Sequence, residues 1–218
     1  MKRIHILLEG QTEEAFAHDL VRPHFLAKGV WLSYSIVATK RTKKGAKFKG
    51  GITSYQRVKN DILMLLRDTS LAAVTTMIDY YGLGNDFPGK DSVGGRAGIL
   101  AAAYLETAFQ NDINNRRFIP YFALHEFEAL LFADPSAIAN AFPGAKVEKK
   151  LLAIRNKYKS PEEINDNPKT HPSARLLALL PRYRKRRHGA LIARNIGLPA
   201  MRATCPHFDE WLTKLEAL

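Results

Sequence analysis

Apolar runs and amphipathic segments alternate along the first 135 residues of the chain. Short apolar or alternating runs that are rich in β-branched and aromatic residues predict strands over 3–8, 31–38, 72–78 and 117–123. Apolar residues that recur at helical spacing predict helices over 12–28, 54–67, 98–111 and 126–132. Because strands alternate with helices, the pattern predicts an α/β fold, in which a mainly parallel, Rossmann-like sheet is flanked by helices.

Helix-starting residues and prolines punctuate this pattern. Thr12 is a good N-cap for the first helix, and Pro23 is expected to kink or split that helix. The Gly- and Pro-rich stretch 80–95 predicts a long loop. From Pro135 onward, repeated prolines divide the chain into short helical segments without a convincing strand. We therefore predict a sheet domain over 1–135 and a helical C-terminal appendage over 136–218 that packs on it.

The composition is that of a globular protein with a strong basic excess. The chain has 218 residues, a formal net charge of +12 and a pI of about 9.8, which favours an anionic partner such as nucleic acid over a merely basic surface. No apolar run reaches the roughly 20 residues of a membrane span, and the N-terminal run is too short for a signal peptide. A single cysteine, Cys205, suits a reducing compartment, so we expect a cytoplasmic protein without a membrane partner.

The basic residues fall into two clusters that are separate in the sequence. The first cluster is a Gly-containing loop, and the second contains an interleaved aromatic residue, Tyr183. Two such clusters are typical of a track for phosphates. The expected nucleic-acid-binding residues are Lys40, Arg41, Lys43, Lys44, Lys47, Lys49, Arg182, Arg184, Lys185, Arg186 and Arg187. Ser173 and Arg175 are further candidates for phosphate contact, although a helix N-cap and a solvated arginine explain them equally well.

Acidic residues follow three of the predicted strands. Glu9 ends the first strand, with Glu13 one helical turn beyond; Asp79 ends the third, with Asp86 in the loop after it. The fourth leads into His125, Glu126, Phe127 and Glu128. The carboxyl ends of parallel strands share one edge of a sheet, so these carboxylates are expected to converge there. Carboxylate oxygens suit Mg²⁺ or Mn²⁺, which polarise phosphates and activate water.

Each acid also has a structural interpretation. Glu13 would complement the macrodipole of a helix, Asp79 or Asp86 would begin a turn, and Glu126 and Glu128 would face solvent on a helix. His125 alone is more typical of a partly buried, hydrogen-bonded histidine. The conjunction of acids at strand ends favours a metal site over these separate explanations. Other chemistries lack their motifs, because the chain has no P-loop, no dinucleotide-binding Gly-x-Gly-x-x-Gly, no zinc-ligand spacing and no Gly-x-Ser-x-Gly elbow.

The stretch Leu8-Glu9-Gly10-Gln11-Thr12-Glu13 resembles the first motif of TOPRIM domains, especially those of the overcoming-lysogenization-defect type nucleases. The whole chain resembles the bacterial family DUF4276, a domain of unknown function that is TOPRIM-like. The stretches that carry this second resemblance begin at Glu9, Asp79, His125, Pro172 and Cys205. The resemblance implies a TOPRIM-like fold, bound Mg²⁺ and a neighbouring AAA-type ATPase in a defence system. It departs from the TOPRIM pattern at Tyr81, where a second aspartate is expected; Asp86 is the candidate replacement.

Two functions follow from these observations. The first is a Mg²⁺- or Mn²⁺-dependent nuclease that hydrolyses DNA or RNA. In it Glu9 and Asp79 ligate the metal, Glu126 or Glu128 completes the site, Glu13 ligates or orients water, and His125 is a weaker candidate for proton transfer. The second is a catalytically degenerate protein that binds nucleic acid or an ATPase partner. The missing second aspartate favours this alternative, whereas the retained acids argue against it.

Overall fold

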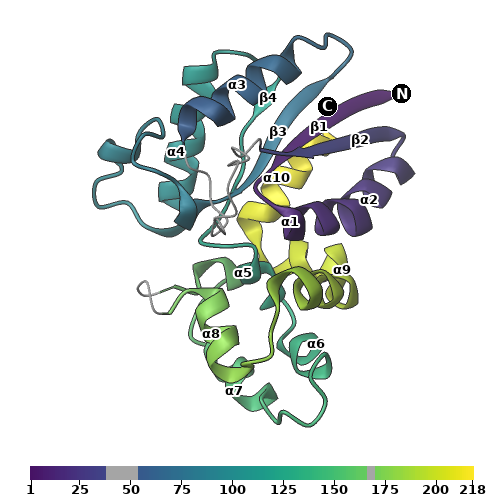
Figure 1. Cartoon of the computed structure of the whole chain (residues 1–218), viewed down its shortest axis with the longest axis vertical. Coiled ribbons are helices and arrows are strands. Elements are labelled where there is room, and N and C mark those ends of the chain that lie inside the picture. The colour runs from purple at the N-terminus through teal and green to yellow at the C-terminus, as the bar shows by residue number, and fades with distance from the viewer. Residues whose placement is uncertain (38–53, 166–169) are drawn as a thin grey trace, which may run out of the picture.

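A computed structural model describes residues 1–37, 54–165 and 170–218 of the chain. The first half alternates strands and helices (Figure 1). Its elements are β1 (Lys2–Leu8), α1 (Gln11–Phe16), a π-helical turn (Ala17–Val21), α2 (Arg22–Ala27), β2 (Val30–Ile36), α3 (Tyr55–Leu66), β3 (Ala73–Asp79), two 3₁₀ turns (Tyr80–Gly82 and Lys90–Ser92), α4 (Gly98–Ile113), β4 (Phe118–Ile119) and β5 (Phe122–Ala123).

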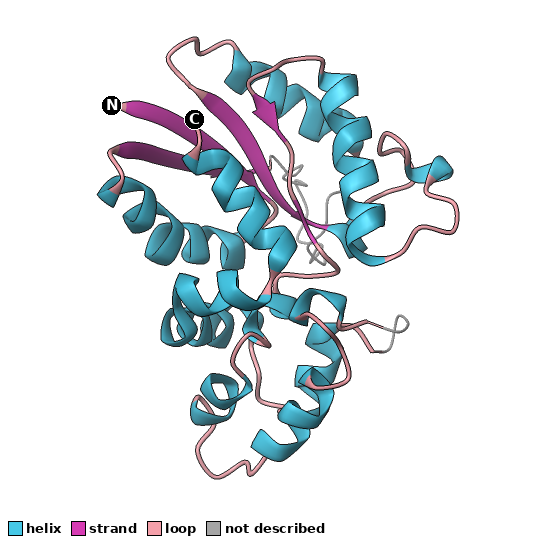
Figure 2. Cartoon of the chain, turned by 180° about the vertical axis from the view of Figure 1, so that it is seen from behind, coloured by secondary structure: helices cyan, strands magenta, loops and turns pink. Residues whose placement is uncertain are grey.

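The second half contains helices joined by loops, with no strand after β5 among its described residues (Figure 2). Its elements are α5 (Glu128–Leu131), α6 (Pro135–Asn140), α7 (Glu148–Arg155), a 3₁₀ turn (Pro161–Glu163), α8 (Pro172–Leu179), the π-helical turn η5 (Lys185–Gly189), α9 (Ala190–Thr204) and α10 (Pro206–Glu216). The expectation of helices without strands after Pro135 is therefore confirmed for these residues. None of the described helices has the length and apolar character needed to cross a membrane.

All strand pairs in the sheet are parallel, and the strand order is β2-β1-β3-β4, with β5 also paired to β3. The chain leaves β1 toward β2 on one side and then crosses to β3 on the other. The point where the strand order reverses therefore lies between β1 and β3. In open α/β sheets the crevice at such a point, outside the carboxyl ends of the strands, is where ligands bind.

Helices cover both faces of the sheet, as the α/β pattern predicted. On one face, α3 and α4 pack through Val58, Ile62, Leu105 and Phe109. On the other face, β1 contributes Ile4, Ile6 and Leu8, while the helices contribute residues such as Phe16, Phe25 and Trp211. The indole of Trp211 in α10 donates to Thr75 in β3 at 2.8 Å. The last helix of the chain thus returns to the sheet, and one apolar core joins the predicted sheet domain and the helical appendage.

Three local expectations are refined by the structure. Thr12, predicted to be the N-cap, lies inside α1, because the helix begins at Gln11 after Gly10. Pro23 follows a π-helical turn, which divides the predicted first helix into three segments. The predicted strand 117–123 forms two short pieces in one register, because Pro120 has no N–H to donate between them. Thr76 fills that gap, since its hydroxyl accepts from Tyr121 N at 2.9 Å.

Candidate active site at the carboxyl edge of the sheet

Glu9 and Asp79 meet where β1 and β3 end. The backbone N–H of Glu9 donates to Met77 O at 3.2 Å, which continues the ladder beyond β1. The backbone N–H of Asp79 donates in turn to Glu9 Oε2 at 2.9 Å. The two acids predicted at separate strand ends are therefore neighbours, and the main chain of one fixes the carboxylate of the other.

Glu13 and Glu128 extend this acidic group, which we call the carboxylate cluster (Glu9, Glu13, Asp79 and Glu128). Glu13 lies in the first turn of α1 and is 3% exposed, and Glu128 opens α5 and is fully buried. The hydroxyl of Tyr183 donates to Glu128 Oε1 at 3.2 Å. Asp79 Oδ1 accepts from the backbone N–H of Phe127 at 2.9 Å. The chain thus brings together acids from β1, α1, β3 and α5.

The ammonium group of Lys185 lies among these carboxylates. Its Nζ is 3.1 Å from Asp79 Oδ2, 3.1 Å from Glu128 Oε2 and 3.7 Å from Glu13 Oε1. Lys185 is the first residue of η5, so it reaches the sheet edge from the helical half of the chain. One positive charge therefore compensates part of the negative charge that the four acids bring together.

Burial dominates the electrostatics of the carboxylate cluster. It raises the pKa of Glu9 to about 8, with the neighbouring charge of Asp79 adding to the effect. Burial also raises the pKa of Glu128 to about 7 and that of Asp79 to about 6, although Lys185 opposes both shifts. Burial by itself would lower the pKa of Lys185, but Asp79 and Glu128 overcome this effect and raise it above its ordinary range. The lysine therefore stays charged, while the acids hold protons more readily than in water.

Two buried oxygens of the cluster depend on Lys185 within the described residues. Glu13 Oε1 and Glu128 Oε2 accept no well-aligned hydrogen bond there, and each faces the ammonium group instead. Buried oxygens without donors are costly, and hard oxygen donors suit Mg²⁺ or Mn²⁺. However, no three His, Cys, Asp or Glu side chains of the described chain are arranged to hold a metal ion. The carboxylate oxygens are of the type that a divalent cation prefers, but in this structure they surround the ammonium group of Lys185.

The family model described as a domain of unknown function, DUF4276, matches residues 8–216 of the chain. The chain belongs to the DUF4276 family. Its matched region contains every member of the carboxylate cluster, together with Lys185. No curated protein and no solved structure matches the chain.

Glu126, a predicted metal ligand in this DUF4276 chain, is engaged by the helical half of the molecule. Its Oε2 accepts from the backbone N–H of Ser173 at 2.9 Å and lies 3.1 Å from His171 Nδ1. The Ser173 hydroxyl donates to the other carboxylate oxygen, Oε1, at 3.1 Å. The ring of Tyr81 stacks on His171 with centroids 5.2 Å apart. Glu126 therefore ties the start of α8 to the sheet edge, and Ser173 contacts this carboxylate rather than standing free for a phosphate.

His125 and Asp86 lie outside the carboxylate cluster. His125 has a left-handed backbone with φ of 66°, and its Nδ1 lies 3.2 Å from Asn165 Nδ2. Burial lowers the pKa of His125. Because His125 adopts this left-handed turn, α5 begins at Glu128 rather than at Glu126 as predicted. Asp86 accepts from the backbone N–H of Tyr55 at 2.7 Å, so its carboxylate is engaged at the start of α3.

The predicted basic clusters differ in how much of them is described. The loop residues Lys40, Arg41, Lys43, Lys44, Lys47 and Lys49 lie outside the described residues. The second cluster is divided between the surface and the interior: Arg182, Arg184, Arg186 and Arg187 are exposed, while Tyr183 is buried and Lys185 points into the carboxylate cluster. Tyr183 is therefore not a surface platform for bases. Arg175 donates to Tyr158 Oη at 2.7 Å and lies over its ring.

The sequence analysis did not assign Lys185 and Tyr183 to the acidic site. The signal that could have indicated them is the spacing in Arg-Tyr-Arg-Lys-Arg, where Tyr183 and Lys185 stand on either side of Arg184, a residue with extended backbone. Extended backbone sends alternate side chains to opposite sides. When the run is interpreted by its charge alone, all of its residues are assigned to the surface, and the inward positions of Tyr183 and Lys185 are missed.

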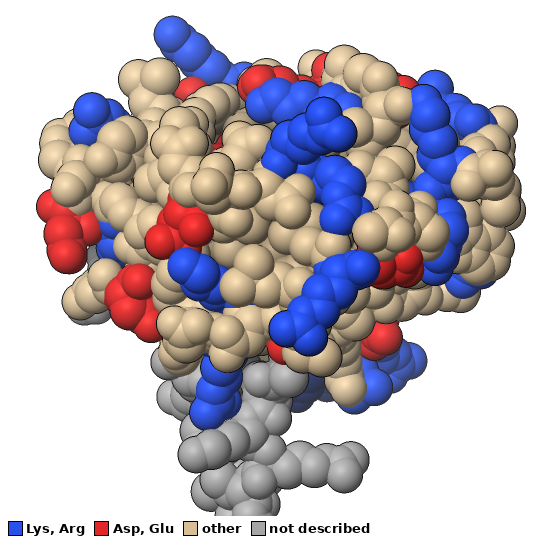
Figure 3. Space-filling model, turned by 90° about the horizontal axis from the view of Figure 1, so that it is seen from above, with Lys and Arg blue, Asp and Glu red and all other residues tan. Residues whose placement is uncertain are grey.

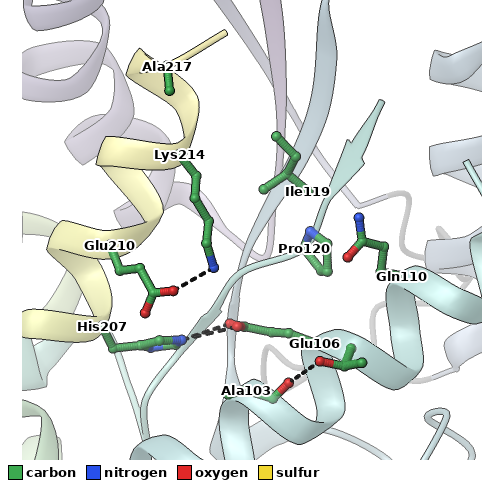
Figure 4. A pocket seen from close by; sticks show the side chains of 10 residues that line it. Ala103, Glu106, Gln110, Ile119, Pro120, His207, Glu210, Lys214 and Ala217 are labelled. Atoms are coloured by element: carbon green, nitrogen blue, oxygen red, sulfur yellow. Dashed lines mark hydrogen bonds and ion pairs between the residues drawn. The ribbon is translucent and has the colours of Figure 1, made fainter. Parts of the chain in front are cut away.

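A second group of buried charges, which we call the histidine cluster, lies between α4 and α10. Glu106 and His207 face each other beside a pocket of about 610 Å³ (Figure 4), with His207 Nε2 at 3.0 Å from Glu106 Oε1. Glu106 Oε1 also accepts from Phe122 N at 2.8 Å. Glu162 accepts from the backbone N–H groups of His207 and Phe208, both at 3.0 Å. Every carboxylate oxygen of this cluster therefore has a donor.

Proposed function

We propose that this DUF4276 protein is a TOPRIM-like, Mg²⁺- or Mn²⁺-dependent nuclease that hydrolyses phosphodiester bonds of DNA or RNA. The observation that carries the proposal is the convergence of four carboxylates from separate elements at the carboxyl ends of β1 and β3, where three of them share one lysine. That is the position at which open α/β sheets bind ligands. The negative charge that one lysine leaves uncompensated would be offset by a bound divalent cation.

Each member of the carboxylate cluster has a distinct task under this proposal. Glu9 and Asp79 hold the divalent cation, and the N–H groups of Asp79 and Phe127 fix the orientation of these carboxylates. Glu128 completes the ligand set in preference to Glu126, because the oxygens of Glu126 are already held by Ser173 and His171. Glu13 ligates the cation or orients water. When bound, the cation polarises the phosphate and lowers the pKa of a water molecule.

The basic segment beside the cluster supports a polyanionic substrate. Arg184 and Arg186 flank Lys185 and are exposed, so they can contact backbone phosphates next to the acids. On the face at the top of Figure 1, where the chain termini lie, basic side chains are interspersed with acidic ones (Figure 3). That arrangement is less suited to a phosphate track than the arginines beside the cluster. From the family resemblance, we also propose a cytoplasmic location and an AAA-type ATPase partner in a defence system.

A second candidate function is a catalytically degenerate protein that binds nucleic acid or an ATPase partner. Two observations favour it: Lys185 fills the carboxylate cluster, and the carboxylate of Asp86 is engaged at the start of α3. In this case Lys185 is a permanent counterion, and the surface arginines alone provide the function.

Cleavage assays separate the two candidates. The purified chain is incubated with single- and double-stranded DNA and RNA in Mg²⁺, Mn²⁺ or EDTA, alone and with a neighbouring ATPase. We expect metal-dependent cleavage that falls by at least about 100-fold in Glu9→Gln and Glu13→Gln. The matched control is Glu14→Gln, which removes the next carboxylate of α1 and should leave cleavage within about threefold of the wild type. Binding without cleavage under all these conditions, unchanged by EDTA and by Glu9→Gln, would establish the degenerate alternative.

A further inference from the structure

Lys185 occupies the same oxygens that a cation would use. Its ammonium group is closest to Asp79 Oδ2 and Glu128 Oε2, and it faces Glu13 Oε1. The Glu13 and Glu128 oxygens are buried and accept no other hydrogen bond within the described residues. A divalent cation bound to these atoms would lie within a few ångströms of Nζ. At that separation like charges repel strongly in a partly buried site.

We propose that Lys185 and a divalent cation are alternative occupants of the carboxylate cluster, so that metal binding requires the ammonium group to move out. The inference rests on the proposed function and concerns its regulation. Lys185 would be a built-in counterion that compensates the charge of the acids until a metal ion binds. Without that counterion, several buried carboxylates would face one another with little compensation.

The surroundings of Lys185 permit this exchange. Its side chain is 38% exposed, whereas those of Glu13 and Glu128 are 4% and 0% exposed. The lysine is therefore the member of the group with open space beside it, and its flexible stem can turn without moving the backbone. The η5 turn is closely packed at Gly189. A Cβ at that position would lie 3.2 Å from Tyr183 Oη and 3.3 Å from Thr12 Cγ2, which leaves little room for the backbone to shift. The exchange is thus a movement of one side chain rather than of η5.

The exposed arginines give the released ammonium group a destination. Arg184 and Arg186 lie on either side of Lys185, so a phosphate bound between them would also attract Nζ. A polyanion would then favour the state in which the carboxylates are open to metal. By linkage, metal and polyanion should each strengthen the binding of the other.

Amine labelling of the wild-type protein tests the exchange without any substitution. Lysines are acetylated briefly with and without Mn²⁺, and the modification at each lysine is quantified by mass spectrometry. We expect the labelling of Lys185 to rise at least about threefold with Mn²⁺. Lys59 is the matched control, because it is also partly exposed and paired, at 2.8 Å from Asp112, and its labelling should not change. If calorimetry shows Mn²⁺ bound while Lys185 labelling stays constant, the exchange is wrong and the metal site survives.

Calorimetry on a variant gives a second, independent test. Lys185→Met should bind Mn²⁺ at least about tenfold more tightly than the wild type, because the competing charge is gone. Lys59→Met should bind Mn²⁺ as the wild type does. Equal or weaker affinity in Lys185→Met overturns the proposal. If neither the wild type nor the variant binds Mn²⁺, the metal-dependent function itself fails, and the exchange fails with it.

Discussion

The molecule contains two groups of buried carboxylates around a cation, and they are built differently. In the histidine cluster, each oxygen of Glu106 and Glu162 has a donor, three of the donors being groups of the main chain. In the carboxylate cluster, Glu13, Asp79 and Glu128 share Lys185, and Glu9 lies beside Asp79. Both groups contain more acids than cations, but directed hydrogen bonds hold each oxygen of the first, whereas Glu13 Oε1 and Glu128 Oε2 in the second face only an ammonium group among the described residues.

This difference separates a structural role from a functional one. A hydrogen-bonded buried pair is destabilising to break, because removal of one partner leaves an uncompensated charge. Four acids around one lysine are costly to bury, so such a group is a candidate for a ligand that supplies further positive charge. The histidine cluster joins α4, α10 and the 3₁₀ turn Pro161–Glu163, while the carboxylate cluster is the one that we propose to bind a cation.

Removal of Glu106 should have the largest effect on stability. Glu106→Ala leaves His207 and the N–H of Phe122 without their acceptor, so we expect the free energy of unfolding to fall by about 3 kcal/mol. Urea unfolding measures the change. Glu210→Ala is the control, because it removes an exposed carboxylate of the same pocket that is paired with Lys214, and it should change stability by less than about 1 kcal/mol. Equal effects of the two variants would contradict a structural role for the histidine cluster.

The carboxylate cluster should make stability depend on pH in the absence of metal. Burial raises the pKa of Glu9 from 4.5 to about 8, so the folded chain binds a proton that the unfolded chain has released. The stabilising contribution is complete below about pH 4.5 and is lost as pH rises through about 8. We expect a loss on the order of 2 kcal/mol after allowance for solvent screening. Unfolding in EDTA across this range should show the decline, and Glu9→Gln should flatten it.

The histidine cluster should give a smaller pH effect. Burial opposes the charged imidazole, but the hydrogen bond and charge of Glu106 raise the pKa of His207 above 6.5. The resulting stabilisation is complete below pH 6.5 and is lost as pH rises through the pKa of the folded state. The difference in unfolding free energy between the wild type and Glu106→Gln should shrink as the pH is raised; a constant difference would show that His207 is uncharged.

The smallest expected change in stability comes from neutralising an acid of the carboxylate cluster. Glu128→Gln keeps an oxygen for the Tyr183 hydroxyl and removes a buried charge, so metal-free stability should change by less than about 1 kcal/mol. Thermal unfolding in EDTA measures this, and the gain in Tm that Mn²⁺ gives the wild type should largely disappear in the variant. A loss as large as that of Glu106→Ala would place Glu128 among the structural residues.

The sequence predicted those features that local patterns determine. Buried runs that end at Glu9 and Asp79 indicated parallel strands with acids at one edge, and the sheet brings these two acids together. Glu128 was among the candidates, but nothing local distinguished it from Glu126, because the difference comes from Ser173 and Tyr183, which lie far along the chain. Lys185 was assigned to a surface run for the same reason. Asp86 caps a helix that begins 31 residues earlier, a contact that no periodicity encodes.

Crystals soaked in Mn²⁺ provide the most direct test of the carboxylate cluster as a metal site. Anomalous scattering should locate a Mn²⁺ ion at typical ligand distances of about 2.0–2.6 Å from carboxylate oxygens of Glu9, Asp79 and Glu128. In the same crystals the ammonium group of Lys185 should have left its positions beside Asp79 and Glu128. A soaked structure in which Lys185 keeps both contacts and no Mn²⁺ lies at this edge of the sheet would contradict the proposed site.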